Sequence, residues 1–375
     1  MEQVRLREGE VRIPSGCAIA GILNRSGQRF NGNTIISCIA NMHQRSNGLG
    51  GGFAAYGIYP EYAEQYALHI YYDHEKAREE CENYLNHNFN IALQGPVPLR
   101  RQAKISNAPI IWRYFALPRE ARLFQEEIEI EEFVFRSVMH INSAIPGAYV
   151  ASSGQNMAAF KGVGYPEDIG EFFRLDDYSA YMWTAHGRFP TNTPGWWGGA
   201  HPFTLLNWSV VHNGEISSYS TNRRFLEMYG YTCSLQTDTE VITYAVDMLM
   251  RRHGLSLEDT VNVISAPMWE DIKDDKQARL RRVYSSLLLN GPFSIIVATG
   301  NGLMAINDRI KLRPLVAAEK GDCLYVSSEE GAIKVVEPSP DKIWSPGGGE
   351  PVVGLLYGKE ELIEPEPKII RALSA

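Results

Sequence analysis

The chain of 375 residues carries a formal charge of −8 at pH 7, and 44% of its residues are apolar. This length allows one large domain or two ordinary ones, and the apolar fraction suits a packed interior. The longest apolar runs fall far short of the roughly 20 residues that cross a bilayer, and the charged opening segment lacks the apolar centre of an export signal. The negative charge, without a dense run of Lys and Arg, argues against nucleic-acid binding. We therefore predict a cytoplasmic protein with neither a membrane span nor a nucleic-acid site.

The five cysteines are odd in number, widely spread and form no Cys-x-x-Cys pair. This pattern argues against a disulfide framework and against a structural zinc site. The histidines show no His-x-x-x-His or His-Glu-x-x-His arrangement with carboxylates at metal spacing, so we expect no bound metal. Any special cysteine is therefore expected to act chemically.

The first half of the chain predicts mixed helices and strands. Residues 18–23 read as an apolar strand, and 34–45 have the apolar spacing of a helix. The glycine-rich segment 46–60 leads into a strand but lacks the Gly-Lys-Ser/Thr ending of a phosphate loop, so we do not expect nucleotide binding. Further on, the patterns predict helices over 75–89 and 131–141, a strand over 110–117 and a hairpin across 148–162. No Gly/Ser-rich or Pro-rich tract brackets this stretch, so we keep it within one domain.

The second half predicts a capped helix, further helices and several strands. Thr237 with Glu240 three residues later is a capping signature, which puts Asp238 in the first turn of a helix. Two more helical segments, 256–264 and one ending near 289, precede the terminator Asn-Gly-Pro at 290–292. Strands follow as a hairpin of 293–299 with 303–308 and near 314–319, 323–328 and 351–357. Helices and strands thus come in groups, which favours an α+β protein with antiparallel sheets.

Cys17 is the first candidate for chemistry. It follows Ser15-Gly16 and directly precedes an apolar strand, so a cut before it would place it at a new chain end. Such a residue would own a thiol, with a pKa of about 8.5, and an α-amino group, with a pKa of about 7.7 to 8.0, that can take the thiol proton. The alternative is a small buried side chain at a strand start, which position alone does not exclude. The downstream polar motifs favour the chemical interpretation.

Four segments carry a family resemblance: CAIAGIL from Cys17, HGRFPTNT from His186, HNGEI from His212 and TDTE from Thr237. Together they resemble the signatures of class II glutamine amidotransferases, and most of all the amidotransferase domain or subunit of glutamate synthase. The resemblance covers about 17–45 and 181–358. It implies the four-layer αββα sandwich of the N-terminal nucleophile hydrolases. It also implies a removed leader at 1–16, an amidotransferase domain at 17–365 with an elaboration around 60–180, and a tail at 366–375.

The resemblance also implies roles for single residues. Cys17 would be the nucleophile, and Asn213 and Gly214 would form the oxyanion hole, which suits an attack that builds negative charge on oxygen. Arg188 would bind the α-carboxylate of the substrate and Asp238 its α-ammonium group. Purely structural alternatives remain open for these residues: a plain turn at Asn213-Gly214, a surface ion pair at Arg188 and a helix-start charge at Asp238.

Other residues near these motifs are expected to support the site without taking part in the reaction. Thr191 and Asn192 would brace a loop over the substrate, and His201 would line the site. Trp196 and Trp197 suit either a lid or ordinary aromatic packing. We interpret three histidines as hydrogen-bonding supports: His186, His201 and His212. Near the end of the chain, a further set resembles a family segment and is expected to form structural ion pairs: Asp308, Arg309 and Arg313.

The predicted reaction is hydrolysis of L-glutamine to glutamate and ammonia through a thioester at Cys17. Nothing recognisable in the chain consumes ammonia, so we expect a partner synthase subunit, with a flavin-containing glutamate synthase as the first candidate. No cofactor is expected in this chain, and FMN and an iron–sulfur cluster are expected only on the partner. Two alternatives stay open: a free-standing amide hydrolase of the N-terminal nucleophile type, and an unprocessed, non-catalytic regulatory subunit.

Overall fold

The computed structural model describes residues 16–101, 104–190 and 195–363. Its largest sheet has seven strands, all antiparallel to their neighbours, with β1 at the centre. In sheet order the strands are β17 (Lys342–Trp344), β15 (Val316–Lys320), β16 (Cys323–Ser327), β1 (Ala18–Asn24), β10 (Met182–Gly187), β3 (Gly51–Tyr56) and β8 (Met157–Gly162). Cys17 therefore lies directly before the central strand, and the motif that begins at His186 starts at the end of the neighbouring β10.

A second, five-stranded antiparallel sheet faces the first. Its strands in order are β11 (Phe203–Leu205), β12 (Trp208–Gly214), β13 (Phe293–Thr299), β14 (Gly302–Asn307) and β18 (Val352–Leu355). Alternate side chains of β12 and β13, such as Val211 and Ile296, pack with Ile19 and Ala54 of the first sheet. The intervening positions face the other way, as expected from the two-residue period of a strand. The predicted hairpin of β13 with β14 is confirmed.

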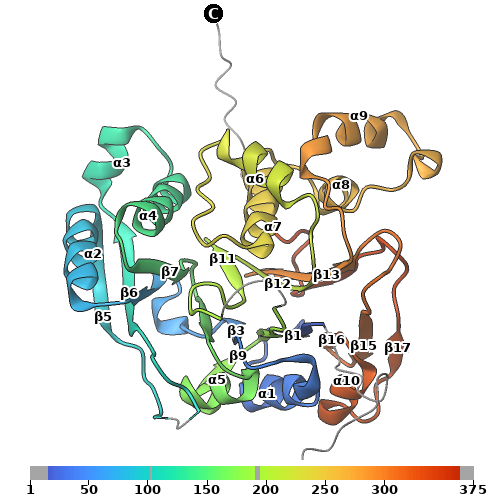
Figure 1. Ribbon diagram of the computed structural model, residues 1–375, viewed down its shortest axis with the longest axis horizontal. Coiled ribbons are helices and arrows are strands. Elements are labelled where there is room, and N and C mark those ends of the chain that lie inside the picture. Colours follow the sequence, from blue (N-terminus) through green and yellow to red (C-terminus); the bar gives the residue numbers. More distant parts are fainter. Residues whose placement is uncertain (1–15, 102–103, 191–194, 364–375) are drawn as a thin grey trace, which may run out of the picture.

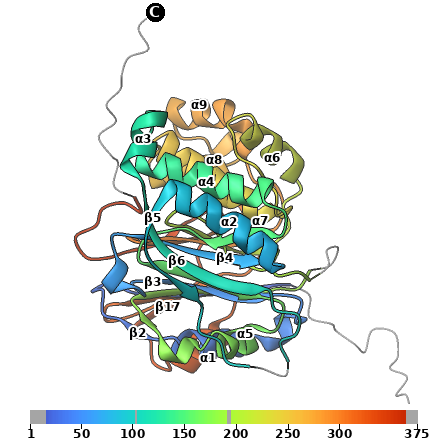
Figure 2. The ribbon, with the colours of Figure 1, turned by 90° about the vertical axis from the view of Figure 1, so that its left-hand side faces the viewer.

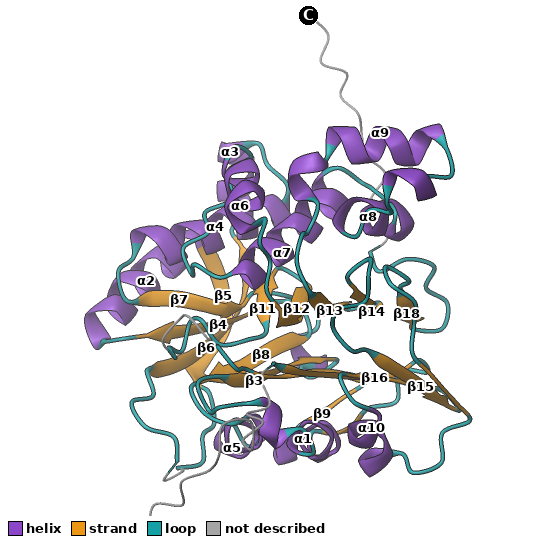
Figure 3. Ribbon diagram, turned by 45° about the vertical axis from the view of Figure 1, so that its right-hand side comes forward, coloured by secondary structure: helices purple, strands orange, loops and turns teal. Residues whose placement is uncertain are grey.

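Helices cover the outer side of each of these sheets, and Figure 3 shows the strands lying between them. On the seven-stranded sheet lie α1 (Asn33–Ala40), α5 (Pro166–Phe172) and α10 (Glu330–Val336). On the other side of the molecule lie α6 (Tyr219–Glu227), α7 (Asp238–Asp247), α8 (Leu257–Ile264) and α9 (Asp275–Val283), seen at the top of Figure 1. Mixed α and antiparallel β structure is thus what the sequence predicted. Within the described ranges, no helix is both long enough and apolar enough to cross a membrane.

The stretch around 60–180 adds a four-stranded sheet beside the core. Its strands in order are β5 (Phe89–Pro96), β6 (Ile110–Pro118), β4 (Tyr66–Tyr72) and β7 (Ala148–Ser152). Its helices are α2 (Glu75–Asn88), α3 (Glu120–Glu126) and α4 (Ile130–Ala144), and Figure 2 shows α2 and α4 lying along this sheet. A short pair, β2 (Phe30–Asn31) with β9 (Ser179–Ala180), completes the strands of the described residues.

The hairpin predicted across 148–162 is wrong. The two strands form, but β7 pairs with β4 whereas β8 pairs with β3, so they belong to different sheets. The reason lies in the link between them, which bonds to other segments. Ser153 Oγ accepts from Leu206 N at 3.0 Å, and Gln155 N donates to Asn207 Oδ1 at 2.7 Å. These bonds direct the chain from one sheet to the next, which a local sequence pattern does not reveal.

The start of α7 is capped as predicted. Thr237 Oγ1 accepts from Glu240 N at 3.2 Å, and Asp238 is the first helical residue. The Glu240 carboxylate accepts from Leu235 N at 3.1 Å, two residues before the cap. The first turn of α7 and the segment before it are therefore held by side chains, and this fixes the backbone position of Asp238.

Candidate functional site

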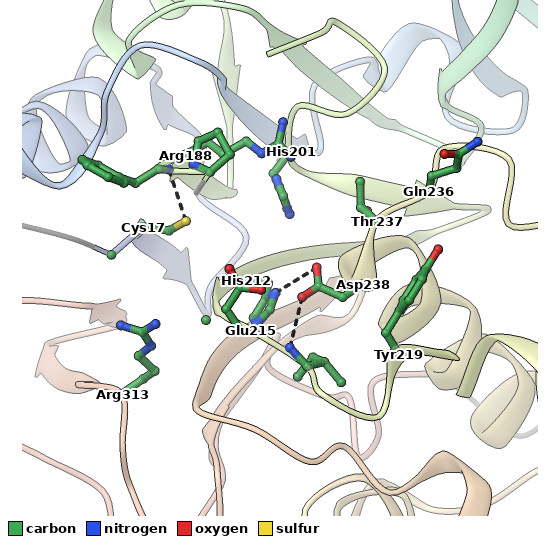
Figure 4. Close-up of a pocket in the computed structure, with 15 residues that line it drawn as sticks. Cys17, Arg188, His201, His212, Glu215, Tyr219, Gln236, Thr237, Asp238 and Arg313 are labelled. Atoms are coloured by element: carbon green, nitrogen blue, oxygen red, sulfur yellow. Dashed lines mark hydrogen bonds and ion pairs between the residues drawn. The ribbon is translucent and has the colours of Figure 1, made fainter. Parts of the chain in front are cut away.

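A cavity of about 440 Å³ opens where the starts of β1 and α7 meet the ends of β10 and β12. Five of the predicted site residues line it: Cys17, Arg188, His201, Gly214 and Asp238. Figure 4 shows the labelled side chains around this space. Thr191 and Asn192 lie outside the described residues. The cavity falls in the size range of small-molecule sites, roughly 300 to 1,000 Å³.

Cys17 is half-buried and immediately precedes β1. Its sulfur accepts a hydrogen bond from Phe189 N at 3.4 Å, and its carbonyl accepts from Arg45 Nε at 3.2 Å. Burial raises the pKa of the thiol, and this is opposed by the Phe189 N–H and the positive charge of Arg188. A neutral thiol needs a nearby base to become a nucleophile. The nitrogen of Cys17 is bonded to Gly16 in this sequence, so a free α-amino group exists only once that bond is cut.

Arg188 directly follows β10 and lies only 6% exposed against the cavity. Its backbone is fixed on both sides, because its N donates to Gly50 O at 2.8 Å and its O accepts from Ser46 Oγ at 3.0 Å. A Cβ on Gly50, whose φ is +157°, would lie 3.0 Å from Arg188 Cδ, so glycine makes room for this side chain. Its burial excludes the alternative of a surface ion pair.

Asp238 points into the cavity from the start of α7. Its Oδ2 accepts from Ile216 N at 3.2 Å, and its Oδ1 lies 3.6 Å from His212 Nδ1. Burial by itself raises the pKa of Asp238, but His212 and the Ile216 N–H outweigh it, and the pKa lies below its usual value. The carboxylate is therefore ionised at neutral pH. Asp238 is both a helix-start charge and a cavity residue, so the two interpretations hold together.

Three histidines support this wall of the cavity. His201 Nε2 lies 2.6 Å from Thr239 Oγ1, and the His201 ring stacks on His186 with centroids 4.1 Å apart. His186 Nε2 donates to His212 O at 2.9 Å. Burial lowers the pKa of His186 to about 3 and that of His201 well below its usual value, so both rings are neutral. In the part of the chain that the structure describes, no group of three or more His, Cys, Asp or Glu side chains is arranged to hold a metal ion.

Asn213 and Gly214 end β12, where Gly214 pairs with Phe293 of β13. They are strand residues, so the plain-turn alternative is wrong. Asn213 is fully buried, and its Nδ2 donates to Ser328 Oγ at 3.4 Å. Its Oδ1 has no partner among the described residues and lies 3.8 Å from the place of a Cβ on Gly16, so the amide borders the chain next to Cys17. Gly214 has φ +150°, and a Cβ there would lie 2.0 Å from Pro292 O.

The segment that begins at residue 195 packs on the elaboration. Trp196 meets Tyr149 edge-on with ring centroids 5.7 Å apart, and Trp197 meets Tyr71 at 6.2 Å. Lys161 is 1% exposed, and its Nζ donates to Gly198 O at 3.0 Å. The two tryptophans thus pack against aromatic rings, which is one of the two roles that the sequence predicted for them. They attach the site-proximal segment to β4, β7 and β8.

The ion pairs predicted for Asp308, Arg309 and Arg313 are wrong for the described residues. Asp308 instead accepts from backbone N–H groups, including those of Phe293 and Leu312. These bonds curl the loop after β14 around the carboxylate, and the loop carries Arg313 to the cavity wall. Sequence reasoning also assigned no site role to three further lining residues: Tyr219, Gln236 and Thr237. For Gln236 and Thr237, closeness to Asp238 in the sequence could have indicated a place in the site.

Comparisons with known proteins give a matching family and several relatives. The model of the family described as class II glutamine amidotransferases matches residues 95–347, a range that holds Arg188, Asn213 and Asp238 but begins after Cys17. An uncharacterized protein of Archaeoglobus fulgidus is 50% identical over 354 residues, covering 92% of this chain and 93% of that protein. A putative glutamine amidotransferase of Methanothermobacter thermautotrophicus is 31% identical over 217 residues, covering 56% of this chain and 63% of that protein. The glutamate synthase [NADPH] large chain of Bacillus subtilis is 29% identical over 212 residues, covering 50% of this chain and only 14% of its own length.

Proposed function

Because the chain belongs to the class II glutamine amidotransferases, we propose that the cavity at Cys17 hydrolyses L-glutamine to glutamate and ammonia through a γ-glutamyl thioester. The observation that carries the proposal is the meeting of a thiol, a buried guanidinium and an ionised carboxylate in one cavity. The thiol supplies a nucleophile. The two charges supply complementary partners for the head group of an amino acid.

Substrate orientation is assigned to Arg188 and Asp238. The planar fork of the Arg188 guanidinium suits the α-carboxylate, and the ionised Asp238 suits the α-ammonium group. Both side chains come from backbone fixed by hydrogen bonds, Arg188 next to Gly50 and Asp238 at the capped start of α7. Fixed partners of opposite charge hold the side-chain amide of glutamine in one position relative to the thiol.

The chemical steps follow from the residues around the thiol. The freed α-amino group of Cys17 takes the thiol proton, the sulfur bonds to the side-chain carbonyl carbon of glutamine, and the carbon–nitrogen bond breaks as ammonia leaves with that proton. Water then attacks the thioester, releasing glutamate and restoring the thiol. The Asn213 amide and the Gly214 N–H are assigned to the negative oxygen, and losing one such donor costs about 2.7 to 4 kcal/mol of barrier. Burial of the thiol supports the need for a base at this position.

The proposal includes the four-layer αββα architecture of N-terminal nucleophile hydrolases. It is supported by two facing sheets with helices on their outer sides. It also includes removal of residues 1–16, because only that cut produces the amine that the mechanism uses. The domain would then run from 17 to 365, with the elaboration around 60–180 and a tail at 366–375.

The ammonia is proposed to pass to a separate synthase subunit, with glutamate synthase as the first candidate. The supporting observation is the similarity to a glutamate synthase large chain, of which this chain covers 14%. FMN and an iron–sulfur cluster would belong to that partner. A cytoplasmic location stays a prediction.

One experiment separates the candidates. The purified chain is analysed by intact mass, and glutamate and ammonia are measured with and without the candidate synthase. Glutamine hydrolysis by a chain that starts at Cys17, with strong activation by the synthase, supports the proposal. Full activity without a partner favours a free-standing hydrolase. A chain that retains its leader and releases no ammonia favours a regulatory subunit and contradicts the proposal.

A further inference from the structure

The end of β16 and the turn after it reach both halves of the candidate site. β16 lies beside β1 in the seven-stranded sheet, as Figure 1 shows, and Ser328 and Glu329 follow its last residue. Neither residue lines the cavity. Their contacts nevertheless lead to Cys17 and to Asn213.

Ser328 is joined to the strand that carries Cys17. Its backbone N donates to Ile19 O at 3.0 Å, and its Oγ accepts from Ile19 N at 3.1 Å. The side chain therefore takes the place of a backbone acceptor two residues after Cys17. Ser328 is 1% exposed, so water does not offer a substitute for this bond.

The same hydroxyl reaches the facing sheet. Asn213 Nδ2 donates to Ser328 Oγ at 3.4 Å, while Asn213 Oδ1 faces the chain next to Cys17. An amide oxygen repels a negative oxygen, so the Asn213 amide must present its NH₂ group to act as a donor there. A serine hydroxyl serves both orientations, because it accepts from Nδ2 in one and donates to Oδ1 in the other. The methyl group of an alanine at this position forms neither hydrogen bond.

Glu329 is connected to Cys17 through Arg45. Its Oε1 pairs with Arg45 Nη1 at 2.9 Å, and Arg45 Nε donates to the Cys17 carbonyl at 3.2 Å. A guanidinium held at one end by a carboxylate has its remaining N–H directions fixed. Cys17 itself is the first residue before β1, so the sheet pairing of this strand begins only at Ala18. The Glu329–Arg45 pair holds the carbonyl group of Cys17, which lies outside the strand.

We propose that Ser328 and Glu329 are positioning residues, Ser328 holding the Asn213 amide in place beside Cys17 and Glu329 fixing Cys17 through Arg45. The proposal rests on the function proposed above. One short turn then aligns the nucleophile with the group that stabilises the developing charge, although the two lie on different sheets.

The first test compares Ser328→Ala and Ser328→Thr in the full processed chain. The number of intact sites is counted with an alkylating glutamine analogue, and kcat is expressed per reactive site, which removes any loss of folded protein. Ser328→Ala is expected to lower kcat about tenfold or more while KM for glutamine changes less than about threefold, since loss of a whole oxyanion donor costs about 100- to 1,000-fold. Ser328→Thr keeps the hydroxyl and is expected to retain about a third or more of kcat. An unchanged kcat per site in the alanine variant, or an equal loss in both variants, overturns the role of Ser328.

The second test uses Glu329→Gln with Glu330→Gln as its matched control. Glu330 pairs with Lys334 on α10, and both of those side chains are about half exposed. Glu329→Gln is expected to lower kcat per site about threefold to tenfold, because small displacements of reacting groups carry large rate penalties, and to leave glutamine affinity intact. Glu330→Gln is expected to match the wild type. Equal behaviour of the two variants overturns the role of Glu329.

The wild-type chain separates this inference from the function on which it rests. If the processed wild type hydrolyses no glutamine, the proposed function itself is contradicted. If the wild type is active and both Ser328→Ala and Glu329→Gln match it, only the positioning inference is contradicted.

Discussion

The sulfur of Cys17 accepts a hydrogen bond from the backbone N–H of Phe189 at 3.4 Å. Phe189 directly follows Arg188, so the candidate nucleophile is tied to the segment that carries the candidate carboxylate-binding residue. A displacement of that segment therefore moves the guanidinium and removes a hydrogen bond from the sulfur together. If Arg188 binds the head group of the substrate, the position of the thiol therefore depends on the same segment that binds the substrate.

Cys17→Ala should abolish glutamine turnover while leaving glutamine binding measurable, because the thiol forms the thioester but does not hold the head group. Ammonia release and calorimetric titration with glutamine measure the two properties. Cys323→Ala is the control, since this half-buried cysteine lies on β16 and does not line the cavity. Retained turnover in Cys17→Ala would remove this residue from the mechanism.

Arg188→Lys should raise KM for glutamine about tenfold or more, with a smaller effect on kcat. A lysine keeps the charge but replaces the two-pronged fork with a single point, which binds a carboxylate less specifically. Steady-state kinetics over a wide range of glutamine concentration measures the change. An unchanged KM rules out the contact with the α-carboxylate.

Asp238→Asn should weaken glutamine binding across the whole pH range in which the wild type binds. Asp238 has a pKa below its usual value of about 3.9, so the wild-type carboxylate stays charged down to a lower pH than an ordinary aspartate. Because the folded-state pKa is lowered, ionised Asp238 stabilises the fold above about pH 3.9, and this contribution is lost as the pH falls through the folded-state pKa. Titrations of variant and wild type with glutamine at several pH values measure the expected loss of binding. Equal affinity of variant and wild type would contradict the assigned role.

Lys161→Met should remove a pH dependence of stability. Burial lowers the pKa of Lys161 to about 7, far below the value of about 10.4 in an unfolded chain. The folded protein therefore binds fewer protons than the unfolded chain between these values, and the wild type gains stability from this group as the pH rises above 7. Thermal unfolding between pH 6 and 9 should show this gain in the wild type but not in Lys161→Met.

Lys334→Met is the control for Lys161→Met, because the Lys334 side chain is 51% exposed in its pair with Glu330. It should keep the wild-type slope. The charge of Glu240 interacts with that of Lys161, and burial raises the pKa of Glu240 to about 7, so the contribution of Glu240 to the pH dependence runs in the opposite direction. The positive charge of Lys161 lowers the pKa of Glu240, so Lys161→Met also extends this opposing contribution to higher pH, and the slope of this variant falls further below that of the wild type. Parallel slopes for Lys161→Met and the wild type would contradict the prediction.

Gly214→Ala should destabilise the fold by about 3 kcal/mol or more and abolish turnover. Its Cβ would lie 2.0 Å from Pro292 O, and φ of +150° is a conformation that a side chain rarely adopts. Gly95→Ala is the matched control, because nothing lies within 4 Å of the place of its Cβ. Denaturant unfolding compares the two variants. A Gly214→Ala protein as stable as the Gly95→Ala protein would show that the strand end adapts.

Local sequence was enough to predict elements whose signals are local. The cap at Thr237 and the hairpin of β13 with β14 depend on residues close together in the chain, and both are present. The strand pairing of β7 and β8 failed, because their partners β4 and β3 lie far away in the sequence. The predicted ion pairs of Asp308 failed for a different reason: its carboxylate accepts from backbone N–H groups of β13 and of its own loop, and the charged residue types in this segment do not reveal backbone partners.

The sequence by itself indicated which residues are candidates for the chemistry. Cys17, Arg188 and Asp238 stood out because they lie in motifs that resemble those of the amidotransferase family, in segments whose polarity does not suit a packed interior. Only the tertiary structure decided how these residues are supported. Ser328, Glu329 and Arg313 reach the site through sheet pairing and loop curvature. Hydrogen bonds and burial depend on three-dimensional proximity, which strand pairing creates between residues hundreds of positions apart.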